Sequence, residues 1–270
     1  MIEAADALDI ARQVAREAAK MLLGVDHIGE VRTKSTFKDL VTEWDTRSDE
    51  LISARLEQLS PGVPRLAEES GASGAVDAGL RWVVDPIDGT VNFSHGIPFW
   101  AVTISLERGG YPVAGVVNAP ALGWEYSAHR DGGAFRNGEP IRVSRVADLR
   151  GAVLATGFPY DRSTADWANF REWEHFQRTA GACRRFGCAS LDLSMVAQGV
   201  FDGYWEAGLK AWDMSAGALL IQEAGGRVTS LTGGPFVSET GQAVGSNGAI
   251  HKQILDELAE VAAVHGGPNA

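Results

Sequence analysis

The chain of 270 residues has a net charge of −11 and contains 45% hydrophobic and 22% charged residues. This length suits one large domain or two smaller ones, and the hydrophobic content is ordinary for a globular protein with a sizeable core. The acidic balance argues against broad electrostatic binding to nucleic acid or to an anionic membrane. A phosphorylated substrate remains compatible with it, because bound cations can reverse the local field.

The N-terminal residues and the cysteines bear on the cellular compartment. Residues 1–4 begin an acidic, amphipathic stretch without the features of a secretory signal, and no apolar run reaches membrane-spanning length. Cys183 and Cys188 are too few for a disulfide framework, and their spacing matches no common zinc motif. We therefore expect a cytoplasmic protein that binds neither a membrane nor zinc.

The first half of the chain is predicted to form helices followed by an antiparallel meander, which is an α+β pattern. The predicted elements are helices at 3–23 and 46–59, extended pieces at 31–35 and 39–42, a Gly-rich loop at 71–80, strands at 82–84, 100–107, 112–118 and 124–129, a tight turn at 137–138 and a short strand at 141–143.

The second half alternates strands with helices, as α/β units do. The predicted elements are strands at 152–156, 184–187, 202–206, 227–230 and 243–245, and helices at 164–179, 190–199 (capped by Ser190), 212–224 and 250–264. The change of pattern predicts two units, residues 1–146 and residues 147–270.

Residues 82–93 contain the strongest chemical signal. The apolar run from Trp82 to Val84 predicts a buried strand, and it ends at Asp85 and Asp88. Carboxylates at the end of a buried strand are costly unless something neutralises them, and a divalent cation with oxygen ligands would do so. A hairpin with two incidental turn aspartates is an equally good local interpretation, since Asp-Gly favours a β-turn.

Other acidic residues also allow two interpretations. Asp45 fits the N-cap of the helix at 46–59. Glu68 and the adjacent Glu69 fit a solvated loop. Asp213 lies in the first turn of an apolar helix, where it pairs favourably with the helix dipole or presents a carboxylate into a site.

Four segments together resemble the inositol monophosphatase family of Mg²⁺-dependent, lithium-sensitive phosphatases. The segments are 39–45, with the pattern DLVT followed by Asp45; 68–70, with EES; 85–90, with DPIDGT; and 212–226, with WD, AG and EAGG. Each segment is only suggestive, but the four occur in the family's order and spacing across nearly the whole chain. The resemblance implies a layered α-β-α-β-α sandwich and a homodimer.

The family's roles, carried to matching positions, imply a magnesium site with two or three ions. Its metal ligands would be Glu68, Asp85, the Ile87 carbonyl, Asp88 and Asp213, with Asp85 bridging two ions. Thr90, assisted by Asp45, would orient and deprotonate a water, with Glu68 as a further catalytic residue, and the N–H groups of Gly89 and Thr90 would bind the phosphate. Where the family commonly has a second threonine after Thr90, this chain has Val91.

This chemistry is consistent with phosphate ester hydrolysis. The transition state spreads negative charge over the phosphoryl oxygens, so cations and fixed N–H donors stabilise it. One cation would activate the attacking water and another would stabilise the leaving oxygen.

The resemblance places substrate selection near Ala189, Glu206 and Lys210, and it places Lys34, also a substrate-binding residue, close to the metals and the phosphate. Glu206 would accept hydrogen bonds from a polyol. Lys210 is equally well explained as a solvated lysine.

We therefore predict a Mg²⁺-dependent phosphomonoesterase acting on a small polyol or sugar phosphate, most simply myo-inositol 1-phosphate. The alternatives on the same scaffold are phosphatases for fructose 1,6-bisphosphate, histidinol phosphate or 3′-phosphoadenosine nucleotides. A different class of protein, a non-catalytic regulator with the same fold, would be expected to have lost some of the carboxylates or Thr90, and none is missing.

Overall fold

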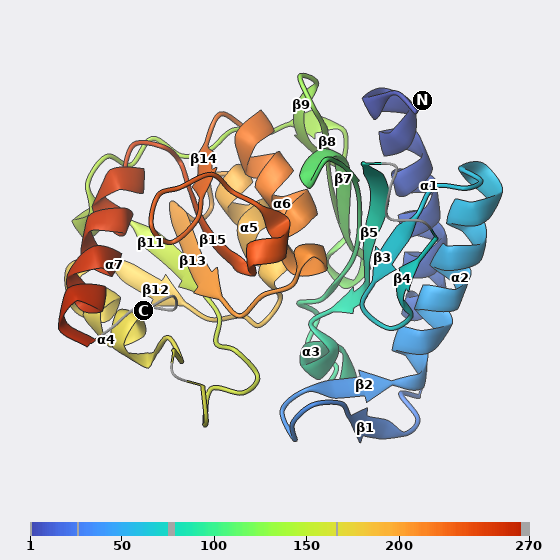
Figure 1. The fold of residues 1–270 in the computed structure, drawn as a ribbon, viewed down its shortest axis with the longest axis horizontal. Coiled ribbons are helices and arrows are strands. Elements are labelled where there is room, and N and C mark those ends of the chain that lie inside the picture. Colours follow the sequence, from blue (N-terminus) through green and yellow to red (C-terminus); the bar gives the residue numbers. More distant parts are fainter. Residues whose placement is uncertain (1, 26, 75–78, 166, 266–270) are drawn as a thin grey trace.

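The computed structural model describes residues 2–25, 27–74, 79–165 and 167–265. They form five layers in which helices and sheets alternate (Figure 1). Helices α1 and α2 cover an eight-stranded sheet, α5 and α6 fill the middle, and a five-stranded sheet separates them from α4 and α7. The predicted α-β-α-β-α sandwich is confirmed.

The α-helices of the described residues are α1 (Ala4–Leu23), α2 (Glu43–Leu59), α3 (Thr90–Ser94), α4 (Phe170–Thr179), α5 (Ala189–Ala197), α6 (Ala211–Glu223) and α7 (His251–His265). The strands are β1 (Val31–Thr33), β2 (Leu40–Thr42), β3 (Arg65–Ala67), β4 (Gly71–Ser73), β5 (Leu80–Asp88), β6 (Ala101–Arg108), β7 (Tyr111–Ala119), β8 (Trp124–His129), β9 (Gly133–Arg136), β10 (Glu139–Pro140), β11 (Val153–Thr156), β12 (Ala182–Arg184), β13 (Gly203–Ala207), β14 (Arg227–Thr229) and β15 (Gln242–Ser246).

The larger sheet has the order β10-β9-β8-β7-β6-β5-β3-β4 and is antiparallel except where β3 runs parallel to β5. Helix α1 packs on one face of this sheet and α6 on the other. Because both faces are covered, β5 is buried at every position from Trp82 to Asp88 rather than at alternate ones. The apolar run in the sequence therefore marks a central strand.

The smaller sheet has the order β12-β11-β13-β15-β14, with β11 parallel to both of its neighbours. Helices α5 and α6 lie between the two sheets (Figure 1) and have buried residues on all sides, as helices in the middle of a layered fold do. Small residues permit this packing. A Cβ on Gly217 would come within 2.5 Å of the Leu193 Cβ, so any larger residue there would push the two helices apart.

Several predicted boundaries are wrong. Helix α4 starts at Phe170 rather than near residue 164, because Pro159 to Thr164 form turns instead of a helical face. Cys188, not Ser190, is the N-cap of α5, and residues 141–143 form no strand. Residues 71–73 of the predicted loop form β4 against β3, while residues 75–78 lie outside the described residues.

The predicted division into residues 1–146 and 147–270 stays a prediction. The eight-stranded sheet uses residues 65–140 and the five-stranded sheet uses residues 153–246. Helix α6 nevertheless packs against strands of both sheets.

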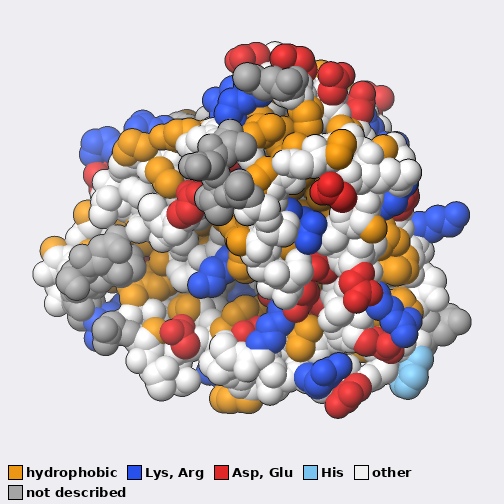
Figure 2. All heavy atoms as spheres, turned by 45° about the vertical axis from the view of Figure 1, so that its right-hand side comes forward, with side chains coloured by type: hydrophobic (Ala, Val, Ile, Leu, Met, Phe, Trp, Pro, Cys, Tyr) orange, Lys and Arg blue, Asp and Glu red, His pale blue; other side chains and the backbone are white. Residues whose placement is uncertain are grey.

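None of the helices in the described ranges combines the length and the apolarity needed to cross a membrane. On the face shown in Figure 2, acidic and basic side chains lie interspersed.

Candidate active site

A cavity opens where β5 ends, and the residues predicted to bind metal and phosphate line it together. Side chains reach it from the β1–β2 hairpin, the end of β3, the end of β5 and the start of α6. Its lining residues are Lys34, Asp39, Glu68, Asp85, Ile87, Asp88, Gly89, Thr90, Tyr160, Gly208, Lys210, Trp212 and Asp213.

The end of β5 is irregular, and this irregularity frees the groups that face the cavity. Pairing with β6 shifts between Asp85 and Asp88, where Pro86 has no N–H to donate. The Ile87 N–H turns back to Asp85 Oδ1 at 3.0 Å, and the Ser48 hydroxyl donates to the Pro86 carbonyl at 3.1 Å. The chain then enters α3, so the interpretation of this stretch as a simple Asp-Gly hairpin is wrong.

Gly89 makes the sharp change of direction possible. Its φ of 91° is in the left-handed region, which side chains disfavour, and a Cβ there would lie 3.2 Å from the Phe99 carbonyl oxygen and 3.3 Å from the Cys188 Cβ. Helix α3 has only five residues, so its dipole is small. Its first N–H groups, including that of Thr90, have no intrahelical partner and are the available anion donors.

The local interpretation of Asp45 as the N-cap of α2 is wrong, because Thr42 is the N-cap. Asp45 occupies the third helical position, and its Oδ2 accepts the Thr42 N–H at 2.7 Å in a capping box. Its Oδ1 accepts the Thr90 hydroxyl at 2.9 Å, and the same hydroxyl lies 3.1 Å from the Ile87 carbonyl oxygen. Asp45 is fully buried, so its capping role holds the carboxylate beside Thr90.

Asp213 and Asp88 are held by backbone N–H groups. Asp213 is the third residue of α6, and its Oδ2 accepts the Lys210 N–H at 2.6 Å, so it serves the helix start and faces the cavity as well. Asp88 Oδ2 accepts the Ser190 N–H at 2.7 Å and the Cys188 thiol at 3.2 Å. Helix α5 is thereby anchored to the end of β5.

The adjacent glutamates do not form a solvated loop. The Lys34 ammonium donates to Glu68 Oε1 at 2.8 Å and also bonds Glu69. The side chains of Glu68 and Glu69 are only 22% and 13% exposed. Lys34, predicted to lie near the phosphate, thus lies at the edge of the cluster of carboxylate side chains.

The electrostatics of the cavity favour cations. Five carboxylates and two lysines line it. Burial, reinforced by repulsion from neighbouring carboxylates, holds the pKa of Asp85 and that of Asp213 well above their ordinary range. The donors are carboxylates and one backbone carbonyl, the oxygen ligands that Mg²⁺ prefers, so these residues fit a magnesium site.

A second cavity adjoins the first and shares Asp88, Tyr160, Gly208 and Asp213 with it. Its other lining residues are Gly157, Phe158, Pro159, Arg185, Gly187, Cys188, Ala189, Asp192, Glu206 and Leu209. The predicted substrate residues Ala189 and Glu206 therefore line a cavity next to the one that the predicted metal ligands line. The exposed Lys210 lines the first cavity.

Sequence reasoning missed three cavity residues with polar side chains, Tyr160, Arg185 and Asp192. Tyr160 lines both cavities from a loop without regular structure, and no motif marks it. Arg185 and Asp192 flank the Gly187–Ser190 segment. The signal for Asp192 was available, because it is a carboxylate in the first turns of an otherwise apolar helix, as Asp213 is.

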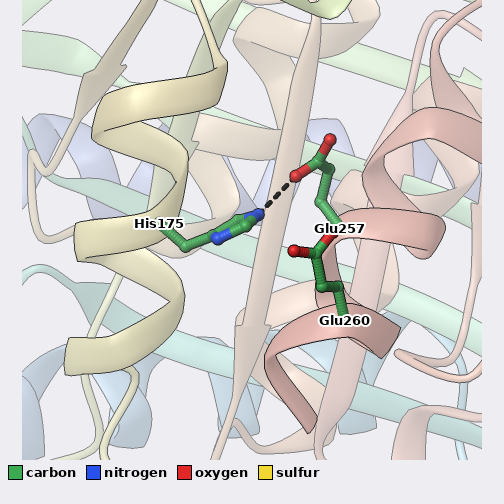
Figure 3. Close-up of side chains that lie close together, drawn as sticks. All are labelled: His175, Glu257 and Glu260. Atoms are coloured by element: carbon green, nitrogen blue, oxygen red, sulfur yellow. Dashed lines mark hydrogen bonds and ion pairs between the residues drawn. The ribbon is translucent and has the colours of Figure 1, made fainter. Parts of the chain in front are cut away.

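A different group with metal-ligand chemistry lies between α4 and α7. One ligand atom from each of His175, Glu257 and Glu260 falls within 4.8 Å of the others, and Figure 3 shows the His175 ring turned toward Glu257, to which it hydrogen-bonds. Glu260 is exposed, and Arg171 and Arg178 line the adjoining groove. The positive charge of these arginines disfavours a bound metal ion. We explain the His175–Glu257 hydrogen bond as a contact that joins α4 to α7.

Comparison with known proteins agrees with this geometry. The model of the inositol monophosphatase family matches residues 3–263. An inositol-1-monophosphatase of Mesorhizobium japonicum is 43% identical over 80% of this chain and 82% of its own length. The Nus factor SuhB of Pseudomonas aeruginosa is 39% identical over 93% of this chain and 95% of its own. The structure of inositol monophosphatase from Anabaena superimposes with a TM-score of 0.86 and 36% identity, covering 94% and 95% of the two chains.

Members of this family are metal-dependent and act on phosphorylated polyols. The match extends over nearly the whole chain and includes the segments that line the cavity. The protein is therefore a member of the inositol monophosphatase family and a phosphoric monoester hydrolase.

Proposed function

We propose that the protein is a Mg²⁺-dependent phosphatase that hydrolyses myo-inositol 1-phosphate to inositol and phosphate. One observation carries the proposal: four buried or half-buried carboxylates, from the end of β3, from β5 and from α6, line one cavity with Thr90, which bonds Asp45, beside a second cavity that contains Glu206. The polar groups of the two cavities suit a phosphate at one end and a polyol at the other.

Glu68, Asp85, the Ile87 carbonyl, Asp88 and Asp213 would hold two or three magnesium ions. When bound, Mg²⁺ lowers the pKa of water and neutralises charge on the phosphoryl and leaving oxygens. The protein keeps the carboxylates in place through hydrogen bonds from the Ile87, Ser190 and Lys210 N–H groups.

Thr90 and Asp45 would handle the proton. Because the Thr90 hydroxyl donates to Asp45 Oδ1, its oxygen keeps a lone pair with which to accept a hydrogen bond from an attacking water. As the water attacks phosphorus, its proton would pass to the Thr90 oxygen while the Thr90 proton moves to Asp45. The N–H groups of Gly89 and Thr90 would bind the phosphoryl oxygens, and Lys34 would add positive charge beside them.

Glu206 would orient the polyol. Its Oε2 accepts the Tyr204 hydroxyl, which leaves Oε1 for a substrate hydroxyl. Gly157 is required here, because a Cβ would lie 2.3 Å from both carboxylate oxygens. Ala189, which lines the same cavity, would leave room for the polyol because its side chain is small. Lys210 would contact a hydroxyl or a second phosphate.

A phosphate-release panel tests this function. The substrates are inositol 1-phosphate, fructose 1,6-bisphosphate, histidinol phosphate and a 3′-phosphoadenosine nucleotide, each with Mg²⁺ and with a chelator. We expect the highest kcat/KM for inositol 1-phosphate and no turnover with chelator. A preference for one of the other substrates would show that the protein is a phosphatase for that substrate instead. Full turnover in the presence of chelator would contradict the metal dependence.

The similarity to proteins named Nus factor SuhB favours one second candidate, a regulator that acts by binding a partner. The complete set of cavity carboxylates argues for turnover, and absence of phosphate release from every substrate in the panel would favour the regulator. The homodimer, the cytoplasmic location and the sensitivity to lithium also stay predictions. Sedimentation, cell fractionation and a lithium titration of turnover would test them.

A further inference from the structure

Two buried carboxyl oxygens in the part of the chain that the structure describes have no hydrogen-bond partner: Asp49 Oδ1 and Asp192 Oδ1. Their side chains are only 4% and 2% exposed. Burying a carboxyl without a partner is costly, so each such group needs an explanation. The two differ in position, because Asp192 lines the second cavity and Asp49 lies on α2 and lines neither cavity of the active site.

Asp192 occupies the fourth position of α5, one turn after Ala189. The start of this helix is held to the end of β5 by the Ser190 N–H and the Cys188 thiol, which both donate to Asp88. Asp192 is therefore held in a fixed position relative to Asp88 at the end of β5. Glu206 on β13 lines the same cavity, so two carboxyl groups from different elements face one space.

From this arrangement, and resting on the proposed function, we propose that Asp192 is a second substrate-binding carboxyl that, with Glu206, binds two hydroxyl groups of the polyol. A bound cation is a poorer explanation, because Arg185 lines the same cavity and contributes positive charge to it. Hydroxyl groups would supply the donors that the described residues do not give Asp192.

The protonation of Asp192 is compatible with this role. Burial, together with repulsion from Glu206 and Asp88, holds the pKa of Asp192 well above its ordinary range. A protonated carboxyl both donates and accepts, so Asp192 would complement the acceptor Glu206. Adjacent hydroxyls of a polyol offer both kinds of partner.

The test uses Asp192→Leu and Asp192→Asn in the full chain with Mg²⁺, with Asp49→Leu as the matched control. KM and kcat are measured for inositol 1-phosphate and for 4-nitrophenyl phosphate, which has no polyol hydroxyls. We expect Asp192→Leu to raise KM for inositol 1-phosphate by about tenfold, the effect of losing one good hydrogen bond. KM for the aryl phosphate should stay within about twofold, and Asp192→Asn should lose less, because an amide still bonds a hydroxyl.

Melting temperature separates binding from folding. Removing an unpartnered buried carboxyl should leave the melting temperature of both leucine variants unchanged or higher, but only Asp192→Leu should lose affinity for the polyol phosphate. Equal changes of KM on both substrates, or no change on either, would overturn the proposal.

Failure of the proposed function is distinguishable from failure of this inference. If the unaltered protein hydrolyses a different polyol phosphate, the proposed substrate is wrong, and the same comparison is made with that polyol phosphate. If Asp192→Asn and Asp192→Leu both fail to fold while Asp49→Leu folds, Asp192 is structural and the proposal is wrong.

Discussion

Two groups of acidic side chains in this molecule offer metal-ligand chemistry, and they differ in their surroundings. At the end of β5, a cavity with two lysines in its lining brings together Glu68, Asp85, Asp88 and Asp213 from three parts of the fold. Between α4 and α7, His175 and Glu257 pair directly, and arginines line the same groove. In the second group Glu257 pairs with His175, whereas in the described part of the chain only Glu68 of the four carboxylates in the first group forms an ion pair, with Lys34.

This difference shows that ligand type alone does not identify a site. The tighter of the two groups, in which three ligand atoms lie within 4.8 Å, is the one we explain as structural. The informative feature at β5 is that Asp85 and Asp213 are buried beside other carboxylates, which raise their pKa, and that Lys34 pairs only with the glutamates at the edge of the cavity.

The largest expected effect comes from removing one carboxylate at β5. Asp88→Asn should lower phosphate release by at least about a hundredfold, because the charge that would hold the second cation is lost. The amide still accepts the Ser190 N–H, so the fold should survive, which circular dichroism would check. Glu260→Gln is the matched control in the other group, and a comparable loss in that variant would break the comparison.

Thr90→Ala should lower kcat by about a hundredfold, since the proton path to Asp45 is removed. Thr90→Ser keeps the hydroxyl and should retain most of the activity. Steady-state phosphate release by both variants distinguishes the role of the hydroxyl from that of the methyl group. Equal activity of the alanine and serine variants would remove Thr90 from the mechanism.

Glu206→Ala extends the comparison to the substrate end of the site. We expect kcat/KM for inositol 1-phosphate to fall by about tenfold relative to that for 4-nitrophenyl phosphate, because a hydrogen bond to the polyol is lost. Competition between the two substrates in one assay measures this ratio directly. Similar losses on both substrates would make Glu206 structural.

Saturating Mg²⁺ should raise the melting temperature by about 5 °C, because a ligand that binds the folded state at a hundred times its Kd adds about 2.7 kcal/mol of stability. Differential scanning calorimetry with Mg²⁺ and with chelator measures the shift. Asp88→Asn should reduce it, and His175→Ala should not. An unchanged melting temperature in the unaltered protein would contradict the metal site at β5.

The smallest effect is expected from His175→Ala without metal. Loss of the contact with Glu257 removes a partly exposed pair, which is typically worth less than about 1 kcal/mol, so the melting temperature should fall by only a few degrees. Catalysis should be unaffected. A tenfold loss of phosphate release in His175→Ala would show that the second group is also functional.

Much of the fold was predictable because apolar periodicity reports burial. The helices at α1 and α6 and the strands from β6 to β8 were placed nearly as observed, and the predicted strand at 82–84 is the middle of the longer β5. Ends of elements were less predictable. The start of α4 is delayed by the turns from Pro159 to Thr164, which apolar periodicity does not reveal. Residues 141–143 look like a strand but make only single backbone bonds, from Ile141 to Ala134 and from Val143 to Ala224.

The candidate site, like the fold, was predictable only in part. Local chemistry marked Asp85 and Asp88 at the end of an apolar run as a candidate site but left an Asp-Gly hairpin as an equal alternative, and the resemblance of four segments decided between the two. Chain order alone could not show that Asp45 bonds Thr90, that Ser190 holds Asp88, or that Asp192 lies beside Glu206 without a partner. Those relations join residues up to about a hundred positions apart, and they exist only once the layers have packed and water has been excluded between them.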